Sequence, residues 1–336
     1  NMIKDEIARE SIYNNVLYPG NGSSPRSITG VGFQPDLLWI KKINSSSNSS
    51  HMLFDSVRGV DKVIITDSTQ AQYDGGGTGY QTSFDTDGFS ITGNGFVNSG
   101  NTFVAWCFKA GGTAVANTNG NIASQVSANV AGGFSIVKWS GNDTTGGTIG
   151  HGLSSTPELT IIKKTSAAAD WQVSLNASVT GVEGYMNLDT TAGLYTTYPL
   201  YYTSSNSTVL SSNGTSTTTR LYNNQSADYI AYCFHSVAGY SKIGSFVGTG
   251  AAGLKIDLDF EPAYILTKRT SSSGASWAII DNKRSTGSNK NNYLQANSSA
   301  AEASSSSGIT FNTDGFTFNG SSFNTNGATH MYYAIA

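Results

Sequence analysis

The sequence predicts an all-β protein made of three tandem antiparallel β-sandwich domains of a jelly-roll or lectin-like type. One observation is a strand motif that occurs three times, in which a proline precedes an apolar, β-prone run and two basic residues: Pro35–Lys42, Pro157–Lys164 and Pro262–Arg269. A second is composition, because only 12% of the residues are charged and the chain contains 38 glycines. Connections rich in Gly, Ser, Thr and Asn are typical of a protein with many short strands and turns.

The repeat extends beyond this motif. Each copy is followed by a closing apolar strand, and these strands end at Phe108, Phe234 and Ala336. The resulting units of roughly a hundred residues match the size of a small domain. We therefore expect an N-terminal arm or linker at residues 1–12, repeat 1 at 13–112, a linker at 113–129, repeat 2 at 130–239 and repeat 3 at 240–336.

Several elements inside the repeats have local signatures. The two basic residues of each motif indicate a solvated strand end. Asp87-Gly88 and Asp314-Gly315 each lie between phenylalanine-bearing segments and predict a hairpin, whose turn favours glycine. The closing strands are too apolar to be edge strands that face water. Cys107 and Cys233 hold the same place in their closing strands, so we expect two buried free thiols.

Four stretches carry a resemblance to a known family: Gly32–Lys41, His51–Gly59, Asp87–Phe89 and Phe103–Gly112, with Trp277–Arg284 standing in repeat 3 where His51–Arg58 stands in repeat 1. Together they resemble a repeated domain of bacteriophage virion proteins, particularly those of marine phages and cyanophages. Repeat 2 departs most, because it lacks the Asp-Gly-Phe hairpin. The resemblance implies a surface or appendage protein of a virion, such as a tail fibre, a spike or a capsid decoration.

Two acidic clusters have the residue types of known sites. Alternate spacing would place Asp257, Asp259 and Glu261 on one face of a strand, as in the jelly-roll glycosidases. A solvated strand face is the simpler interpretation. Asp85 and Asp87 beside a glycine suggest calcium, but the hairpin turn alone explains these residues.

Other pairs of polar residues have structural explanations. Asp55 with Arg58 recurs as Asp281 with Arg284, which favours an ion pair within each domain over a ligand-binding pair. The four histidines have no metal-ligand spacing. We expect no catalytic residue, no metal and no cofactor.

The binding candidate is a tyrosine-rich insertion in repeat 2, with Tyr195, Tyr198, Tyr201 and Tyr202. Tyrosine offers an apolar face for a sugar ring and a hydroxyl for its polar edge. The alternative is that these side chains pack against a neighbouring domain or subunit.

The resulting hypothesis is a virion structural protein that is not an enzyme, and that acts as a tail fibre or spike component in attachment to host glycans. Its expected partners are further copies of itself, including a trimer, other virion proteins and cell-surface glycans. A net charge of −3 offers no surface for nucleic acid, and no apolar run reaches the ~20 residues that cross a bilayer. The alternatives are a capsid decoration or cement protein, a non-viral carbohydrate-binding surface protein and, as the weakest, a glycosidase.

Overall fold

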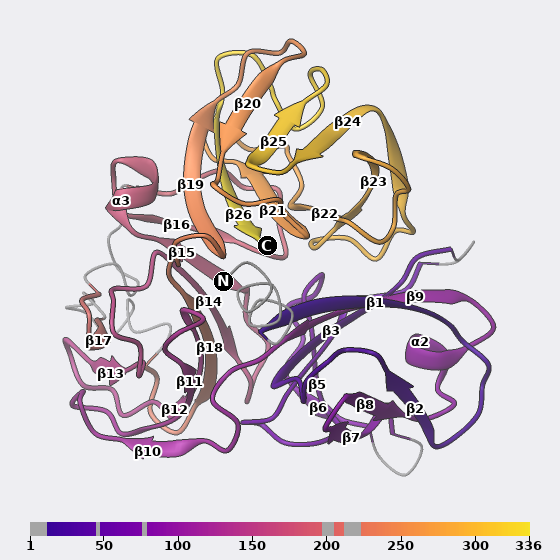
Figure 1. Cartoon of the computed structure of the whole chain (residues 1–336). Helices are drawn as coiled ribbons and strands as arrows, with labels where there is room; N and C mark the ends of the chain where they lie inside the picture. The colour runs from indigo at the N-terminus through magenta and orange to yellow at the C-terminus, as the bar shows by residue number, and fades with distance from the viewer. Residues whose placement is uncertain (1–11, 45–47, 76–78, 197–204, 212–222) are drawn as a thin grey trace.

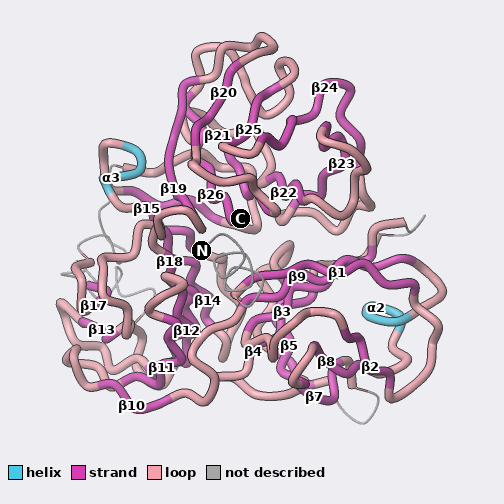
Figure 2. The backbone as a smooth tube through the Cα atoms, in the orientation of Figure 1, coloured by secondary structure: helices cyan, strands magenta, loops and turns pink. Residues whose placement is uncertain are grey.

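The computed structural model describes residues 12–44, 48–75, 79–196, 205–211 and 223–336, and the predicted arm at residues 1–12 lies outside them apart from Ile12. The all-β prediction is confirmed, because the described chain is strand and loop with only two four-residue helices, α2 (Gly95–Asn98) and α3 (Ala177–Thr180) (Figure 2). Every ladder between named strands is antiparallel in this part of the chain.

Repeat 1 contains two sheets. The larger has the order β1-β9-β3-β4-β5-β6 and the smaller has the order β2-β8-β7. Their strands are β1 (Tyr13–Pro19), β2 (Arg26–Thr29), β3 (Leu37–Lys42), β4 (Met52–Asp55), β5 (Lys62–Ile65), β6 (Tyr73–Asp74), β7 (Gln81–Asp85), β8 (Gly88–Ile91) and β9 (Thr102–Phe108). The closing strand β9 lies between β1 and β3, as its apolar sequence predicts.

Repeat 2 has a sheet of order β10-β11-β12-β18-β14-β15-β16 and a two-stranded sheet of β13 and β17. The strands are β10 (Val115–Asn117), β11 (Ser124–Asn129), β12 (Phe134–Ser140), β13 (Thr148–Gly150), β14 (Leu159–Lys164), β15 (Gln172–Leu175), β16 (Gly184–Asn187), β17 (Val209–Ser211) and β18 (Asp228–Phe234).

The predicted linker at 113–129 is wrong. It contains β10 and β11, and β11 pairs with β12 along its whole length. The Gly, Ala, Asn and Thr content of this segment hid its alternation, in which Ser124 and Val126 are buried while Gln125 is exposed. We count residues 113–129 as part of repeat 2 from here on.

Repeat 3 forms one eight-stranded sheet in the order β19-β26-β21-β22-β23-β24-β25-β20. Its strands are β19 (Ser241–Val247), β20 (Leu254–Asp257), β21 (Tyr264–Arg269), β22 (Ala278–Asp281), β23 (Asn289–Gln295), β24 (Ala303–Asn312), β25 (Gly315–Phe318) and β26 (Thr329–Ile335). Phenylalanines of β25 share one apolar cluster with Ile265 of β21, so the sheet folds over and packs on itself.

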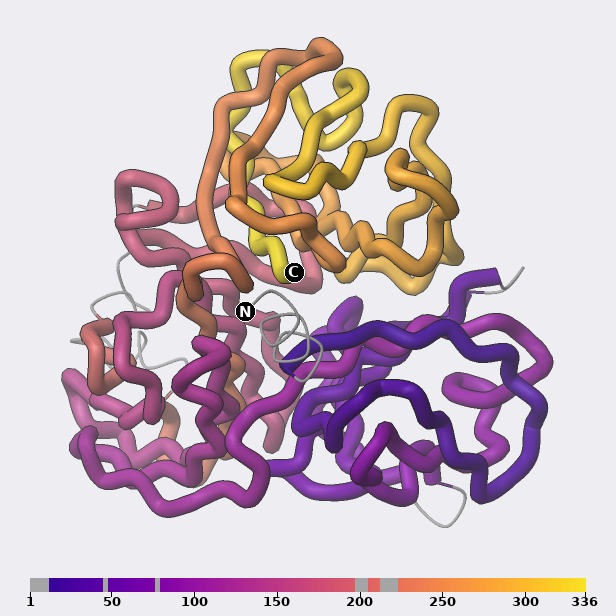
Figure 3. Tube along the Cα trace, viewed as in Figure 1, coloured from indigo at the N-terminus to yellow at the C-terminus, as the bar shows by residue number. Residues whose placement is uncertain are grey.

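The three repeats occupy three lobes that meet at a common centre, where the C-terminus lies (Figures 1 and 3). Each lobe has its own apolar cluster, and a fourth cluster takes residues from all three repeats. Neighbouring residues of one strand divide between the two kinds of cluster: Leu38 and Ile40 belong to the cluster inside lobe 1, whereas Leu37 and Trp39 belong to the shared one. The main sheets are therefore buried on both faces, which explains why their central strands are apolar throughout.

Both predicted hairpins are confirmed, with Asp85 paired to Gly88 and Asn312 to Gly315 across two-residue turns. Glycine is needed directly after each turn, at Gly88 and Gly315. At Gly88 the backbone φ is 142°, and a Cβ atom there would lie 2.0 Å from the carbonyl oxygen of Ile28. The cysteine prediction is also confirmed, because Cys107 and Cys233 are buried free thiols.

Candidate functional site: the junction of the three repeats

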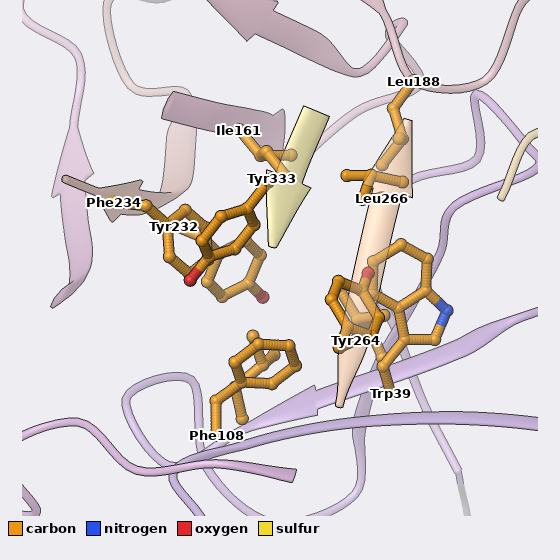
Figure 4. A pocket seen from close by; sticks show the side chains of 11 residues that line it. Trp39, Phe108, Ile161, Leu188, Tyr232, Phe234, Tyr264, Leu266 and Tyr333 are labelled. Atoms are coloured by element: carbon orange, nitrogen blue, oxygen red, sulfur yellow. The ribbon is translucent and has the colours of Figure 1, made fainter. Parts of the chain in front are cut away.

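The centre of the molecule is an apolar junction. Its small cavity, of about 20 Å³, is lined by side chains of all three repeats: Leu37, Trp39, Leu53, Phe108, Ile161, Leu188, Tyr232, Phe234, Tyr264, Leu266 and Tyr333. In Figure 4 the labelled side chains converge on this space from strands of different lobes. A space of this size could hold at most one water, and its apolar lining offers that water few partners. The junction is therefore a packed core rather than a ligand site.

Each pair of repeats is joined by the same two backbone hydrogen bonds, and we call these contacts seams 1/2, 2/3 and 1/3. In seam 1/2, Gln72 N donates to Thr165 O (2.9 Å) and Ala169 N donates to Thr69 O (2.8 Å). The corresponding bonds of the other seams are Leu194 N to Thr270 O and Gly274 N to Thr191 O in seam 2/3, and Glu302 N to Ile43 O and Ser49 N to Ser299 O in seam 1/3. Because the accepting positions correspond in all three repeats, the arrangement is cyclic.

A buried ring nitrogen crosses each seam beside these bonds. Nε1 of Trp171 donates to Ile65 O (2.8 Å), and Nε1 of Trp277 donates to Asn187 O (2.9 Å). In repeat 1 the corresponding residue is His51, whose Nε2 lies 3.0 Å from Gln295 O. Trp39 Nε1 donates to His51 Nδ1 (2.8 Å), which leaves Nε2 as the protonated nitrogen that donates across the seam. Burial holds the pKa of His51 well below its ordinary value, so the ring is neutral.

The first basic residue of each strand motif is buried at a seam, which overturns the prediction of a solvated strand end. Lys41, Lys163 and Lys268 are at most 1% exposed. Their Nζ atoms donate to carbonyl oxygens of the neighbouring repeat, at Ser299 (3.3 Å), Thr69 (2.9 Å) and Thr191 (3.1 Å) respectively. Burial lowers the pKa of each of these lysines to about 8.

The acidic surroundings of these lysines differ between repeats. Asp67 raises the pKa of Lys41, and Asp189 and Asp170 raise that of Lys163, although burial outweighs both effects. The side chains of Asp67 and Asp189 accept the backbone N–H of His51 and Trp171. In repeat 3 this place is taken by Asn297, whose Oδ1 accepts the N–H of Trp277 at 2.8 Å. The amide keeps the hydrogen bond but supplies no negative charge.

Two of the seams also contain a buried ion pair. Arg58 Nε lies 2.5 Å from Asp55 Oδ2, and Arg284 Nε lies 2.6 Å from Asp281 Oδ2. These pairs within a repeat are as predicted, and each aspartate additionally accepts a bond from another repeat. Tyr232 OH donates to Asp55 Oδ2 (2.7 Å), and Trp106 Nε1 donates to Asp281 Oδ2 (3.0 Å). In repeat 2 the equivalent residue is Leu175, which joins the shared apolar cluster.

The junction holds three sheets in one fixed arrangement. The lysines, the ring nitrogens and the Asp–Arg pairs of the seams are buried and engaged in hydrogen bonds between repeats. The sequence analysis missed this site, but strand alternation could have revealed its lysines: Leu37, Trp39 and Lys41 are two apart and face the same way. Each seam hydrogen bond joins residues of two different repeats, so no short stretch of sequence identifies both of its partners.

The tyrosine insertion is only partly described. Tyr195 is 45% exposed and stacks on Tyr185, with ring centroids 5.1 Å apart. Just before it, Leu194 N donates to Thr270 O, so the insertion begins where repeat 2 contacts repeat 3. Tyr198, Tyr201 and Tyr202 lie outside the described residues. The structure therefore places one tyrosine of the four, at an exposed site beside a seam.

The three acidic residues are solvated, as the simpler interpretation predicts: Asp257, Asp259 and Glu261 are exposed, while Leu258 and Phe260 between them are buried. They do not share one strand, because β20 ends at Asp257 and Asp259 has a φ of 65°. Asp257 lies 2.9 Å from Lys255 Nζ, which also contacts Asp314 at 2.6 Å. These exposed groups form surface ion pairs, and the paired carboxylates that the glycosidase comparison requires are not aligned on this strand.

The other candidate ligands have partners within the protein. Asp85 accepts the hydroxyls of Ser83 and Ser90, while Asp87 accepts the backbone N–H of Gly30 and Gly32, which lowers the pKa of Asp87. Within the described ranges, no three His, Cys, Asp or Glu side chains are grouped to hold a metal ion. The same ranges contain no helix long and apolar enough to cross a membrane.

Comparison with family models gives one match, which covers residues 9–336. The chain belongs to the family described as Domain of unknown function (DUF7483). The match spans all three repeats. A search of curated proteins found none that matches the chain.

Proposed function

We propose that this chain is a structural protein of a bacteriophage virion, in which three β-sandwich repeats of a jelly-roll or lectin-like type form one rigid block. The observation that supports a scaffold most directly is the seam that is repeated three times, with paired backbone bonds, a ring nitrogen and a buried lysine at every seam. Such buried, saturated contacts leave little freedom for lobe motion. The virion location rests on the resemblance of the repeat sequences.

Within a virion, the block fits a tail fibre or spike component that presents polar loops to host glycans. An open groove on repeat 2, of about 450 Å³, supports an adhesive surface. Its lining includes the exposed side chains of Asn121, Gln125 and Asn142, together with Lys138. Amide and ammonium groups of this kind hydrogen-bond sugar hydroxyls, and many copies of a weak site would give useful avidity.

The proposed protein is not an enzyme, and it associates with other virion proteins and with further copies of itself. Because the inner faces of the three sheets are used within one chain, a trimer would have to form through the outward surfaces. A capsid decoration protein is the second candidate, since a rigid block without moving parts suits a shell equally well.

The test is to locate the chain in purified phage particles, by mass spectrometry of the particle proteins followed by electron cryomicroscopy. Copies at the tail in multiples of three support attachment. A lattice of copies over the shell supports decoration instead. The proposal is overturned if the chain is absent from the purified particles of every phage whose genome encodes it.

A further inference from the structure

Repeat 3 contains a second cavity, of about 150 Å³, at the end of its main sheet. Strands β21, β22, β23 and β26 and the loop before β26 form its walls. The cavity is smaller than the ~300–1,000 Å³ of pockets for drug-sized ligands, so it suits a single small ring or the tip of a longer molecule.

The cavity is positively charged without an acidic counterpart. Arg269 lines it, together with Lys268, whose Nζ donates to Thr191 O and Ala275 O, and no carboxylate is among the described residues that line it. Repeats 1 and 2 place Asp67 and Asp189 near the corresponding lysine, whereas repeat 3 has Asn297. Repeat 3 thus keeps the buried cation and lacks the negative charge that accompanies it elsewhere.

Two nitrogens that belong to residues lining the cavity have no partner within the described chain. Arg269 Nε and His330 Nε2 are both buried and make no hydrogen bond there. His330 is 3% exposed, and its ring stacks on Phe246 with centroids 5.1 Å apart, which fixes its orientation. Buried polar atoms are almost always satisfied in folded proteins, so these two nitrogens are available to a polar ligand in the cavity.

An aromatic pair forms another wall. Tyr293 and Phe323 lie edge to face, with ring centroids 5.1 Å apart, and both line the cavity. Phe323 has a φ of 59°, a conformation that is rare for a bulky residue. Backbone strain of this kind is concentrated at ligand sites, where it fixes a side chain in position.

We propose that this cavity binds a small ring-shaped carboxylate, such as the terminal acidic residue of a glycan. The carboxylate pairs with Arg269, a ligand hydroxyl bonds to His330 Nε2, and the ring lies against Tyr293 and Phe323. The anion site follows from the residues of repeat 3 alone, whereas the choice of a sugar acid rests on the proposed adhesive function.

The test is calorimetric titration of the purified full chain with sodium glucuronate, glucose and inorganic phosphate. Glucuronate should bind at least about tenfold more tightly than either of the others, a ratio that corresponds to ~1.4 kcal/mol. Asn297→Asp restores the carboxylate of repeats 1 and 2 and should weaken glucuronate binding about tenfold or more, because the internal charge competes with the ligand.

Arg269→Gln should weaken binding similarly, while Lys164→Gln, at the corresponding place in repeat 2, should leave it unchanged. Thermal unfolding of each variant checks that it is folded. His330→Phe introduces the residue that repeat 1 has at the equivalent position, Phe103. It should also weaken glucuronate binding, because it removes the ring nitrogen that bonds to the ligand hydroxyl. No binding of glucuronate, or equal binding by Asn297→Asp, overturns the proposal. Phosphate or glucose binding as tightly as glucuronate overturns the sugar acid. Because the isolated chain is titrated, these outcomes do not depend on where the protein sits in a virion.

Discussion

Seams 1/2 and 1/3 contain a buried ion pair that seam 2/3 lacks. In each of these two Asp–Arg pairs, the aspartate also accepts a hydrogen bond from a tyrosine or tryptophan of another repeat. In repeat 2, Leu175 occupies the place of the aspartate and Ser178 that of the arginine, yet the backbone bonds, the ring nitrogen and the lysine are unchanged. A buried ion pair is thus not required to form a seam, in agreement with the near balance between desolvation and attraction for such pairs.

The largest expected effect comes from breaking one pair. Asp55→Leu leaves Arg58 buried without its carboxylate and Tyr232 without its acceptor, and should lower the free energy of unfolding by about 3–5 kcal/mol. Chemical denaturation measures this change.

The double variant Asp55→Leu/Arg58→Ser copies the residues of repeat 2, and should recover roughly half of that loss or more because no charge is left unpaired. A double variant as unstable as the single one would contradict the comparison, and would mean that the pair itself is required.

The next effect depends on pH and concerns what all seams share. The pKa values of Lys41, Lys163 and Lys268 are about 8 in the folded chain and 10.5 ordinarily. The unfolded chain therefore binds more protons between these values, and stability should rise with pH, by about 1 kcal/mol per lysine from pH 8 to 9.

Burial raises the pKa values of Cys107 and Cys233, so above pH 9 these thiols lose their protons in the unfolded chain first, and this lowers the free energy of unfolding as pH rises. The range from pH 8 to 9 therefore isolates the effect of the lysines best. Denaturation at pH 8 and 9 should show this slope, and each single Lys→Met variant should remove about a third of it. A slope that is unchanged in all three variants would show that these lysines are not its source.

The smallest effect concerns single seam hydrogen bonds. Trp171→Phe and Trp277→Phe each leave one buried carbonyl oxygen without its donor, and each should cost about 1–3 kcal/mol in the free energy of unfolding. The two losses should be similar, because the two indoles make the same contact. Tyr195→Phe, at an exposed ring, is the control and should stay within about 0.5 kcal/mol. A large difference between the two tryptophan variants would mean that the seams are not equivalent.

Local signals accounted for much of the fold. The proline before β3, β14 and β21, the apolar closing strands and the Asp-Gly turns each identify an element from a few neighbouring residues. The prediction failed at β10 and β11, where small polar residues alternate weakly. It failed also at Lys41, because a basic residue at a strand end usually reaches water.

The sequence by itself determined that the chain is all-β, that it repeats three times, and that its central strands are apolar on both faces. Only the tertiary structure decided what covers the second face. In each repeat that face packs against the other two repeats, and the contacts join residues as distant in sequence as Trp106 and Asp281. The same holds for Arg269 and His330, which become a candidate anion site only because folding pairs the two strand ends beside a cavity that lacks an acid. Burial and missing charge are properties of the assembled surroundings, and no single stretch of sequence contains them.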